Sequence, residues 1–168
     1  MFSKSHTLAK LFFAMAIASG VTSGTPANCD ASPPAFDTTE KTKRPDLNGV
    51  RVKTAASPDI YLIVDGELRH IPSPEIYDRL FKSWDGIVVD NNIDRIVMGK
   101  PLTDAVLIKG SNSPDVFLLD RGVKRHISSP ATMSHYNFAW NRVHTSPQAE
   151  VDAIEKTGKQ IVMPTKLK

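Results

Sequence analysis

The stretch SPDIYLIVDGELRHIPSP, residues 57–74, returns later in the chain as SPDVFLLDRGVKRHISSP, residues 113–130. An ungapped alignment of residues 50–84 with residues 106–140 holds 13 identities in 35 positions. The identities include a Trp, an Arg-His-Ile step and a Ser-Pro step in each copy. Self-similarity at a fixed period is typical of a duplicated structural unit. The sequence therefore predicts a tandem repeat.

Each copy opens with segments typical of β-strands. Residues 50–53 alternate apolar and polar side chains, which favours a half-buried strand. Residues 60–64 are apolar throughout, as expected of a central strand covered on both faces. Asp65 and Gly66 then form a strong hairpin signal, because glycine tolerates the positive φ that a two-residue turn requires. Residues 67–71 are the expected return strand.

Helices are expected after these hairpins. Ser73 and Ser129, each followed by a proline, are typical helix starts, because serine accepts from free amides and proline fits the first helical position. A short strand is expected at residues 87–89. A second short helix should end at Gly99 in the first copy. Its counterpart should be capped at Ser146 and end at Gly158.

These elements predict an α+β fold. Two tandem β-hairpin–helix–strand–helix repeats, residues 49–102 and 103–168, should be related by pseudo-twofold symmetry. Their cores should merge, since a unit of about 55 residues buries little apolar surface alone.

The amino terminus, residues 1–27, is typical of a secretory signal peptide. Basic residues Lys4 and Lys10 precede an apolar run that begins at Leu11 and spans only residues 11–18. That run is shorter than the ~20 apolar residues that a membrane-spanning helix needs. The mature chain is therefore expected to be secreted or periplasmic, and not to span a membrane.

Residues 28–48 are rich in Pro, Thr and Asp without apolar periodicity, which predicts a disordered linker. Cys29 lies in this segment and could form an intermolecular disulfide. A lipid anchor on Cys29 is disfavoured, because the residues before it lack the expected Leu and the small residue immediately preceding the cysteine. With one cysteine in the chain, no internal disulfide can hold the fold.

The composition excludes several classes of function. The formal charge of +3 falls to +1 without residues 1–27, since 19 basic then face 18 acidic residues. Nucleic-acid binding needs a clustered basic face, and the longest basic cluster lies in the linker at residues 41–44. No nucleic-acid partner is expected. Serine-hydrolase, zinc-protease and phosphate-loop motifs are absent from the sequence, which favours a non-enzymatic role, although a catalytic pair distant in sequence stays open.

The repeat resembles a family. The pattern V-Y-L-x-x-x-G-x-x-R-[WH]-I-x-[SN]-P, with a Trp about ten residues later, is similar to a tandem repeat found in exported bacterial proteins. Here it spans residues 50–161 and includes Gly66 and Gly122. The resemblance implies location and fold, and it brings no defined ligand or catalytic residue. Because the family places Trp or His at positions 70 and 126, it also implies a packing role for these histidines.

The candidate ligand-binding residues are the repeated polar and aromatic side chains Arg69, His70, Trp84, Arg125, His126 and Trp140. Arg and His neighbours on one strand point to opposite faces, so they cannot converge on one site. The favoured interpretation is that the repeated Arg and His serve folding and that each Trp is a wedge between helix and sheet. Alternatively, each Trp could stack on a sugar ring. No metal or cofactor is expected, because no set of ligands is united by a motif.

The sequence thus predicts an exported binding module acting at or outside the bacterial cell envelope. A groove between the repeats, with aromatic and Arg/His side chains, would bind a cell-wall or surface polysaccharide or a partner protein. Two other classes stay open. One is a small extracellular hydrolase, or its accessory subunit or inhibitor, and the other is a secreted toxin or effector.

Overall fold

The computed structural model describes residues 40–164. The predicted signal peptide at residues 1–27, most of the predicted linker and Cys29 lie outside the described residues. The described chain combines short helices with two mixed sheets, so the α+β class is confirmed. Below, residues 40–102 are called the first half and residues 103–164 the second half.

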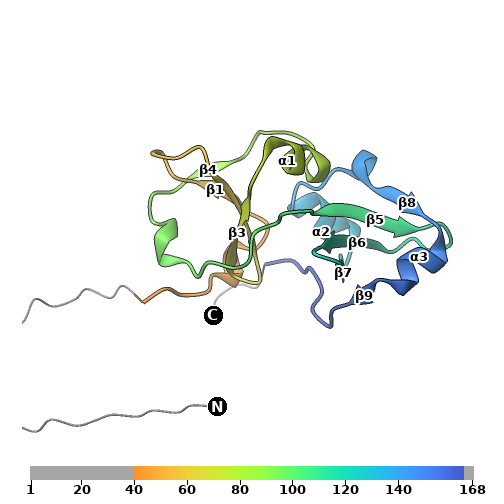
Figure 1. Cartoon of the computed structure of the whole chain (residues 1–168). Coiled ribbons are helices and arrows are strands. Elements are labelled where there is room, and N and C mark those ends of the chain that lie inside the picture. The colour runs from red at the N-terminus through yellow and green to blue at the C-terminus, as the bar shows by residue number, and fades with distance from the viewer. Residues whose placement is uncertain (1–39, 165–168) are drawn as a thin grey trace, which may run out of the picture. The chain divides into compact units, whose positions relative to one another are not determined.

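The first half is built on a four-stranded sheet (Figure 1). Its strands are β1 (Arg51–Lys53), β2 (Ile60–Val64), β3 (Glu67–Ile71) and β4 (Val88–Val89), in the order β3-β2-β1-β4. Neighbours pair antiparallel except β1 and β4, which run parallel. Helix α1 (Pro74–Leu80) connects β3 to the segment that returns to the far edge of the sheet.

The second half is built on a five-stranded sheet. Its strands are β5 (Val106–Gly110), β6 (Val116–Asp120), β7 (Val123–His126), β8 (His144–Ser146) and β9 (Glu155–Lys156), in the order β8-β5-β6-β7-β9. The central pairs are antiparallel, and both outer pairs are parallel. The helices of this half are α2 (Pro130–His135), the 3₁₀ helix η3 (Trp140–Arg142) and α3 (Gln148–Ala153).

Strand register in the two sheets corresponds under the same ungapped alignment that relates the two copies in the sequence. Three pairings of the first sheet and their counterparts in the second are Val52 with Val88 and Ile108 with His144, Arg51 with Leu62 and Leu107 with Leu118, and Tyr61 with His70 and Phe117 with His126. A one-residue slip in either sheet would place every side chain of the strand on the other face. Equivalent positions therefore face equivalent sides of their sheets.

The hairpin and helix starts follow from local chemistry. Asp65 and Gly66 have φ values of 57° and 75°, so the predicted two-residue turn is present. The Ser73 hydroxyl accepts a hydrogen bond from the Ile76 amide at 3.4 Å, and the Ser129 hydroxyl accepts one from Thr132 at 3.1 Å. Both α1 and α2 therefore begin at the predicted serine caps.

The second predicted helix of each copy is shorter than expected. In the first half it is a single 3₁₀ turn, η2 (Ile93–Arg95), which ends before Gly99. In the second half α3 ends at Ala153 rather than Gly158, and Ser146 does not cap it. Ser146 belongs instead to β8, where its carbonyl accepts from the Ser111 amide at 2.9 Å. Strand pairing thus removes this serine from the helix start.

The linker predicted at residues 28–48 ends earlier than expected, because its last residues belong to the fold. Thr42 forms a bridge with Ile96, and Pro45–Leu47 form the 3₁₀ helix η1. Asn48 is 4% exposed, and its side-chain oxygen accepts from the Gly66 amide at 2.8 Å. This bond satisfies a backbone donor in the hairpin turn, so the fold begins several residues before position 49.

One residue of β1 departs from the predicted alternation. The pattern predicts that Arg51 faces solvent, yet it is 5% exposed. Its guanidinium donates to the carbonyl oxygens of Ser83 at 2.8 Å and Asp85 at 2.6 Å and to the Tyr77 hydroxyl. Its carbon lies 5.2 Å from the centre of the Phe81 ring, a cation–π distance. These distant partners offset the cost of burying the charge, whereas Leu107 fills the equivalent position.

The central core joins both halves. It includes Leu62, Val64, Ile76, Tyr77, Leu80 and Phe81 from the first half and Leu107, Leu118, Ile127, Met133, Tyr136 and Phe138 from the second. On the opposite face of the first sheet, Ile63 packs with Ile93 of η2. On the opposite face of the second sheet, Phe117 packs with Val151 of α3. Strand β2 is therefore covered on both faces, as its apolar run predicts.

The two halves also pair through backbone. Phe81 and Phe138 form an antiparallel bridge, the Ala139 amide donates to Leu80 at 2.8 Å, and the Lys82 amide donates to Asn137 at 3.1 Å. The segments that lead to Trp84 and Trp140 thus run side by side in opposite directions.

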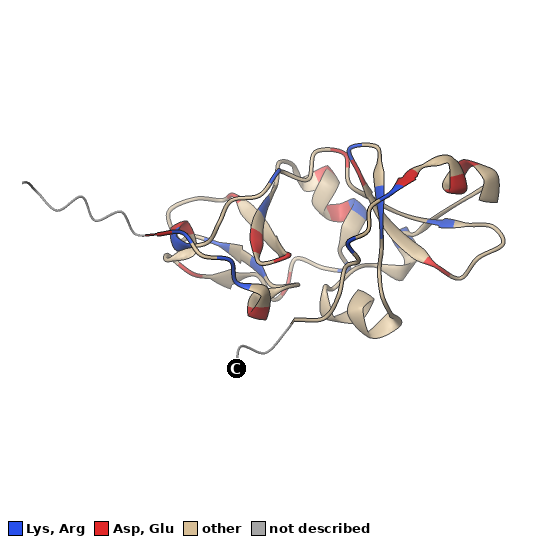
Figure 2. Cartoon of the chain, turned by 90° about the horizontal axis from the view of Figure 1, so that it is seen from below, with Lys and Arg blue, Asp and Glu red and all other residues tan. Residues whose placement is uncertain are grey.

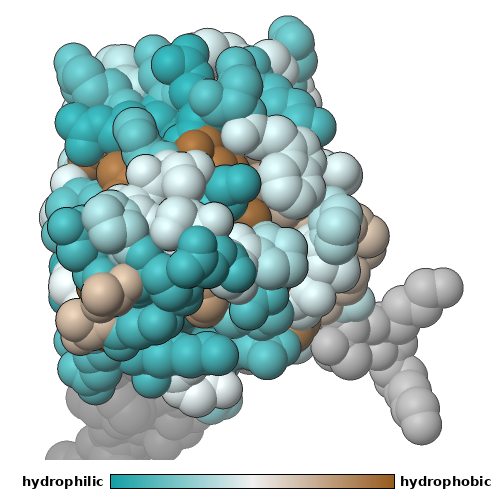
Figure 3. Space-filling view, turned by 90° about the vertical axis from the view of Figure 1, so that its right-hand side faces the viewer, coloured by the Kyte–Doolittle hydropathy of each residue, from teal (hydrophilic) through white to brown (hydrophobic). Residues whose placement is uncertain are grey.

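Charges and apolar groups are dispersed over the described chain. Lys and Arg are interspersed with Asp and Glu along the ribbon (Figure 2). The face that carries α3 and β8 is mostly hydrophilic, with hydrophobic residues in small separate spots (Figure 3). Among residues 40–164 no helix is both long and apolar enough to cross a bilayer.

Candidate functional site: two equivalent pockets and a junction cavity

Each half contains a pocket at the point where its central hairpin meets its helix. The Trp84 pocket has a volume of about 300 Å³ and the Trp140 pocket about 270 Å³. Every residue that lines the Trp84 pocket has a counterpart, at the equivalent position of the second copy, that lines the Trp140 pocket. The pairs are Pro58 and Pro114, Asp59 and Asp115, Ile60 and Val116, Ile71 and Ile127, Pro72 and Ser128, Ser73 and Ser129, Pro74 and Pro130, Tyr77 and Met133, and Trp84 and Trp140.

The local sequence explains the chemistry of the Trp84 pocket. Its floor combines Ile60, Ile71 and proline rings, which offer no backbone N–H. The Ser73 hydroxyl on its wall is engaged in capping α1. Asp59 directly follows the Ser-Pro step, and its carboxylate accepts a hydrogen bond from the Ser57 hydroxyl at 2.8 Å. The pocket is therefore largely apolar, with one anchored carboxylate at its wall.

Each Trp lies half-exposed at its pocket, which corrects the prediction that it wedges between helix and sheet. Trp84 and Trp140 are both 47% exposed. The Trp84 ring stacks on Tyr77, with centroids 4.0 Å apart and an interplanar angle of 20°, and its N–H donates to Asp78 at 2.9 Å. The stacking on Tyr77 covers one face of the Trp84 indole. Because nearly half of the residue is exposed, the opposite face of the ring is available to a ligand.

The two histidines pack on aromatic rings of the neighbouring strand. His70 lies 5.2 Å from Tyr61, and His126 lies 5.5 Å from Phe117, between ring centroids. The imidazole Nε2 of His70 is 3.8 Å from Asp59, and that of His126 is 3.6 Å from Asp115. His126 also lines the Trp140 pocket. Both histidines therefore combine packing with a position beside the pocket carboxylate.

The two arginines lie at a different place, in a cavity between the halves. This junction cavity, of about 260 Å³, is lined by Arg69, Lys100, Asp120, Arg121, Val123, Arg125 and Thr157. The predicted inter-repeat groove therefore brings the two arginines together. It does not bring the two Trp or the two His to the same place, because these lie at the two separate pockets.

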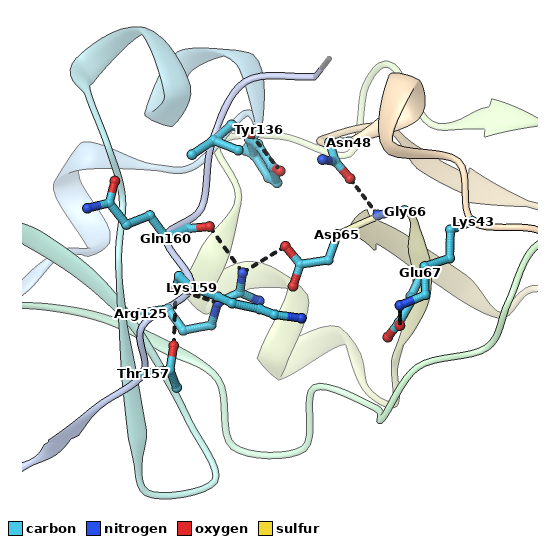
Figure 4. Close-up of polar contacts among 11 residues, drawn as sticks. Lys43, Asn48, Asp65, Gly66, Glu67, Arg125, Tyr136, Thr157, Lys159 and Gln160 are labelled. Atoms are coloured by element: carbon cyan, nitrogen blue, oxygen red, sulfur yellow. Dashed lines mark hydrogen bonds and ion pairs between the residues drawn. The ribbon is translucent and has the colours of Figure 1, made fainter. Parts of the chain in front are cut away.

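Each arginine reaches across the junction to a carboxylate of the other half. Arg69 Nη2 lies 2.7 Å from Asp120 Oδ2. Figure 4 shows the second pair, in which Arg125 Nη2 lies 3.0 Å from Asp65 Oδ1. Arg69 Nε also donates to the Lys100 carbonyl. The corresponding contact of Arg125 is from Nε to the Lys159 carbonyl at 3.4 Å, and its Nη2 also donates to the Gln160 carbonyl at 3.2 Å. Both guanidiniums thus tie the hairpin end of one half to the other.

The alignment of residues 50–84 with residues 106–140 could not reveal these pairs. Position 120 is equivalent to Val64, and position 65 is equivalent to Arg121, so neither carboxylate is repeated. The two arginines occupy equivalent positions, but their acidic partners do not. In the alignment, Asp120 lies one position before the equivalent of Asp65. Only the assembled junction identifies Asp65 and Asp120 as their partners.

Burial dominates the electrostatics of the Arg69–Asp120 pair. The two side chains are 11% and 8% exposed. Desolvation raises the pKa of Asp120 and lowers the pKa of Arg69, while each opposite charge acts against that effect. Arg121 Nε lies 3.1 Å from the same Asp120 oxygen. The other oxygen, Oδ1, is buried and has no hydrogen-bond partner in the described part of the chain.

Comparison with protein-family models, curated proteins and solved structures found no significant match. Within residues 40–164, no group of three or more His, Cys, Asp or Glu side chains is arranged to hold a metal ion. The candidate site is thus defined by its own geometry: two equivalent aromatic pockets and one charged junction.

Proposed function

We propose that the chain is an exported, non-enzymatic binding module formed by duplication of one unit, and that its two equivalent pockets bind a glycan at or outside the bacterial cell envelope. The observation that carries the proposal is the recurrence of every lining position of the Trp84 pocket in the Trp140 pocket. A duplicated fold must repeat its core. The Trp of each pocket is half-exposed, so it stabilises the fold less than a fully buried core residue does. Its recurrence at both pockets therefore supports a shared binding role.

Duplication with pseudo-twofold symmetry accounts for several independent features. The matching strand registers, the matching serine caps and the matching pockets all follow one ungapped alignment of the two copies. A merged core is what two small units would need, because each alone has little apolar surface to bury.

The chemistry of the pockets favours a sugar. The apolar face of a pyranose ring packs on an indole, while its hydroxyl groups donate to carboxylate oxygens. Each pocket offers such a pair, Trp84 with Asp59 and Trp140 with Asp115. The pocket volumes of about 300 and 270 Å³ lie at and just below the lower limit for small-molecule sites, which suits a single sugar ring.

Two like pockets on one body favour a ligand that also repeats. A polymer that engages the first pocket is held at high effective concentration near the second, so binding is strengthened without any new contact. A cell-wall or surface polysaccharide has this property. Export is supported by the signal-peptide pattern of residues 1–27 and by the resemblance to repeats of exported bacterial proteins.

The available contacts favour binding over hydrolysis. In the described part of the chain, neither His70 nor His126 has a serine or cysteine oxygen or sulfur within hydrogen-bonding distance. A nucleophile and its base normally lie within that distance of each other. The imidazoles beside Asp59 and Asp115 therefore suit ligand contact better than covalent catalysis.

The proposal is tested by sedimentation of the chain with purified cell-wall glycan and surface polysaccharide, followed by titration with their oligosaccharides. Trp84→Ala and Trp140→Ala should each weaken binding to the polymer by about a hundredfold or more, because either change removes the avidity of the pair. The double variant should lose binding. Met98→Ala is the matched control, since Met98 is 51% exposed and lines neither pocket.

Undiminished binding by the double Trp variant would overturn the assignment of the pockets. Recovery of a protein, with no glycan bound by the wild-type chain, would assign the module to a protein partner instead.

A further inference from the structure

The junction cavity is a separate site from the two pockets. Strand β2 begins with Ile60, which lines the Trp84 pocket, and its last residue is followed by Asp65, which contacts the junction through Arg125. In β6, Val116 lines the Trp140 pocket, whereas Asp120 at the other end lines the junction cavity. The pockets and the cavity therefore lie at opposite ends of the two central strands.

The cavity is rich in cationic donors. Arg69, Lys100, Arg121 and Arg125 line it together with a single carboxylate, Asp120. The cations still outnumber the acids when Asp65, which pairs with Arg125, and Asp104, which accepts from the Arg121 amide, are included.

Several of these donors remain available. Within residues 40–164, the Nη1 groups of Arg69 and Arg125 and the Nζ group of Lys100 have no hydrogen-bond or ion-pair partner. Arg69 and Arg125 are 11% and 13% exposed, so their guanidiniums are held in place by the junction rather than by solvent. Planar guanidiniums in fixed positions are suited to bind carboxylate or phosphate oxygens in a bidentate manner.

One oxygen of the Asp120 carboxylate is closed off from the cavity. Asp120 is 8% exposed, and its Oδ1 has no partner in the described chain. A buried acceptor without a hydrogen bond is costly and calls for an explanation. Besides burial, the neighbouring Asp104 carboxylate acts to raise the pKa of Asp120. Since Oδ1 has almost no accessible surface, a ligand in the cavity would contact the cationic donors rather than this oxygen.

We infer that the junction cavity binds an acidic sugar residue, whose carboxylate contacts Arg69, Arg125 and Lys100. The inference rests on the proposed function, in which the chain binds a glycan. It adds that this glycan is anionic, because it contains the acidic sugar. An inorganic phosphate shares the anionic chemistry, but it lacks a sugar ring with adjacent hydroxyl groups.

The test uses the full chain and three probes, namely an oligomer of galacturonic acid, the matching neutral oligomer of galactose, and inorganic phosphate. Calorimetry should show the acidic oligomer binding about tenfold or more tightly than the neutral one, since hydrogen bonds to charged groups are the stronger class. The Nε–H resonances of Arg69 and Arg125 should shift with the acidic oligomer in NMR spectra. Raising the salt concentration should reduce the preference.

The variant pair is Lys100→Glu with Arg121→Gly. Lys100 is exposed, and only its backbone carbonyl supports the Arg69 side chain, so its replacement leaves that contact in place. Arg121 has a φ of 52°, a conformation that glycine adopts freely. This double variant should lose the preference for the acidic oligomer. The matched control is Lys82→Glu, which makes the same charge reversal at an exposed residue outside the cavity.

Equal affinity for the acidic and neutral oligomers would overturn the inference, as would an undiminished preference in the double variant. Phosphate binding as tightly as the acidic oligomer would replace the sugar assignment with a simple anion site. Failure of the proposed function gives a different result. The double variant Trp84→Ala with Trp140→Ala should weaken the binding of both oligomers equally, whereas the junction variant should remove only the difference in affinity between them.

Discussion

Replacing Asp120 with valine tests whether the junction is held by a buried ion pair. The pair joins side chains that are 11% and 8% exposed, with 2.7 Å between Arg69 Nη2 and Asp120 Oδ2. Valine is the natural replacement because Val64 fills the equivalent position of β2. The change leaves Arg69 buried with only the Lys100 carbonyl as a partner.

The expected loss is about 3–5 kcal/mol in the free energy of unfolding, the range for removing one member of a buried pair. Arg121 adds little to this loss, because it is 38% exposed and water can replace its contact. Asp65→Asn is the matched control, since Asp65 is 30% exposed and asparagine tolerates its φ of 57°. Because Arg125 keeps its carbonyl contact at residue 160, this control should cost only about 1 kcal/mol.

Urea unfolding followed by Trp fluorescence measures both losses, provided that the dependence on urea concentration is unchanged. The double replacement Arg69→Met with Asp120→Val should recover most of the stability, because it removes the isolated charge along with its partner. If Asp120→Val proves no more destabilising than Asp65→Asn, the buried pair does not hold the junction. Failure of the double replacement to recover stability would also refute the reasoning.

Three further outcomes are expected. Gly66→Ala should cost at least about 1 kcal/mol more than Gly122→Ala by chemical denaturation, because both have φ above 70° but only at Gly66 would a Cβ lie 2.8 Å from the Arg44 amide nitrogen; equal losses would contradict this. Ser129→Ala should cost about 1 kcal/mol by removing the cap of α2, and Ser129→Asp should retain most of the stability. The carboxyl resonance of Asp120 should titrate above the ordinary range, because burial raises the pKa of Asp120. The folded state then binds the proton more tightly than the unfolded chain, so the unfolding free energy should fall as pH rises from about 4 through the raised pKa, and Asp120→Asn should lose this part of the slope.

Strands, turns and caps were predictable because their causes are local. The apolar run of residues 60–64, the glycine at position 66 and the serine at position 73 each fix a conformation through nearest neighbours. Once the lining of the Trp84 pocket is known, the internal sequence alignment gives the lining of the Trp140 pocket. Whether a Trp covers the core or faces solvent depends on distant packing, so the exposure of Trp84 could not be predicted from its hydrophobic character.

Burial of charge was unpredictable for the same reason. Arg51 is buried because the carbonyl oxygens of Ser83 and Asp85, far along the chain, accept from its guanidinium. Asp120 likewise pairs with an arginine of the other half. Neither partner is visible in the local pattern. Residues 42–48 have the composition of a linker, yet they form hydrogen bonds with the backbone of the hairpin turn at residues 65–66. Such bonds leave no periodic pattern in the sequence, so this part of the fold could not be predicted.

The two indole N–H resonances offer the sharpest test of paired glycan recognition. The chain has two Trp residues, so NMR spectra contain two such signals, one from each pocket. Titration with an oligosaccharide of the bound polymer, short enough to occupy one pocket at a time, should shift both signals with dissociation constants within about tenfold of each other, a difference of about 1.4 kcal/mol. Movement of one signal alone, or of neither at saturating binding, would contradict the existence of two equivalent sites.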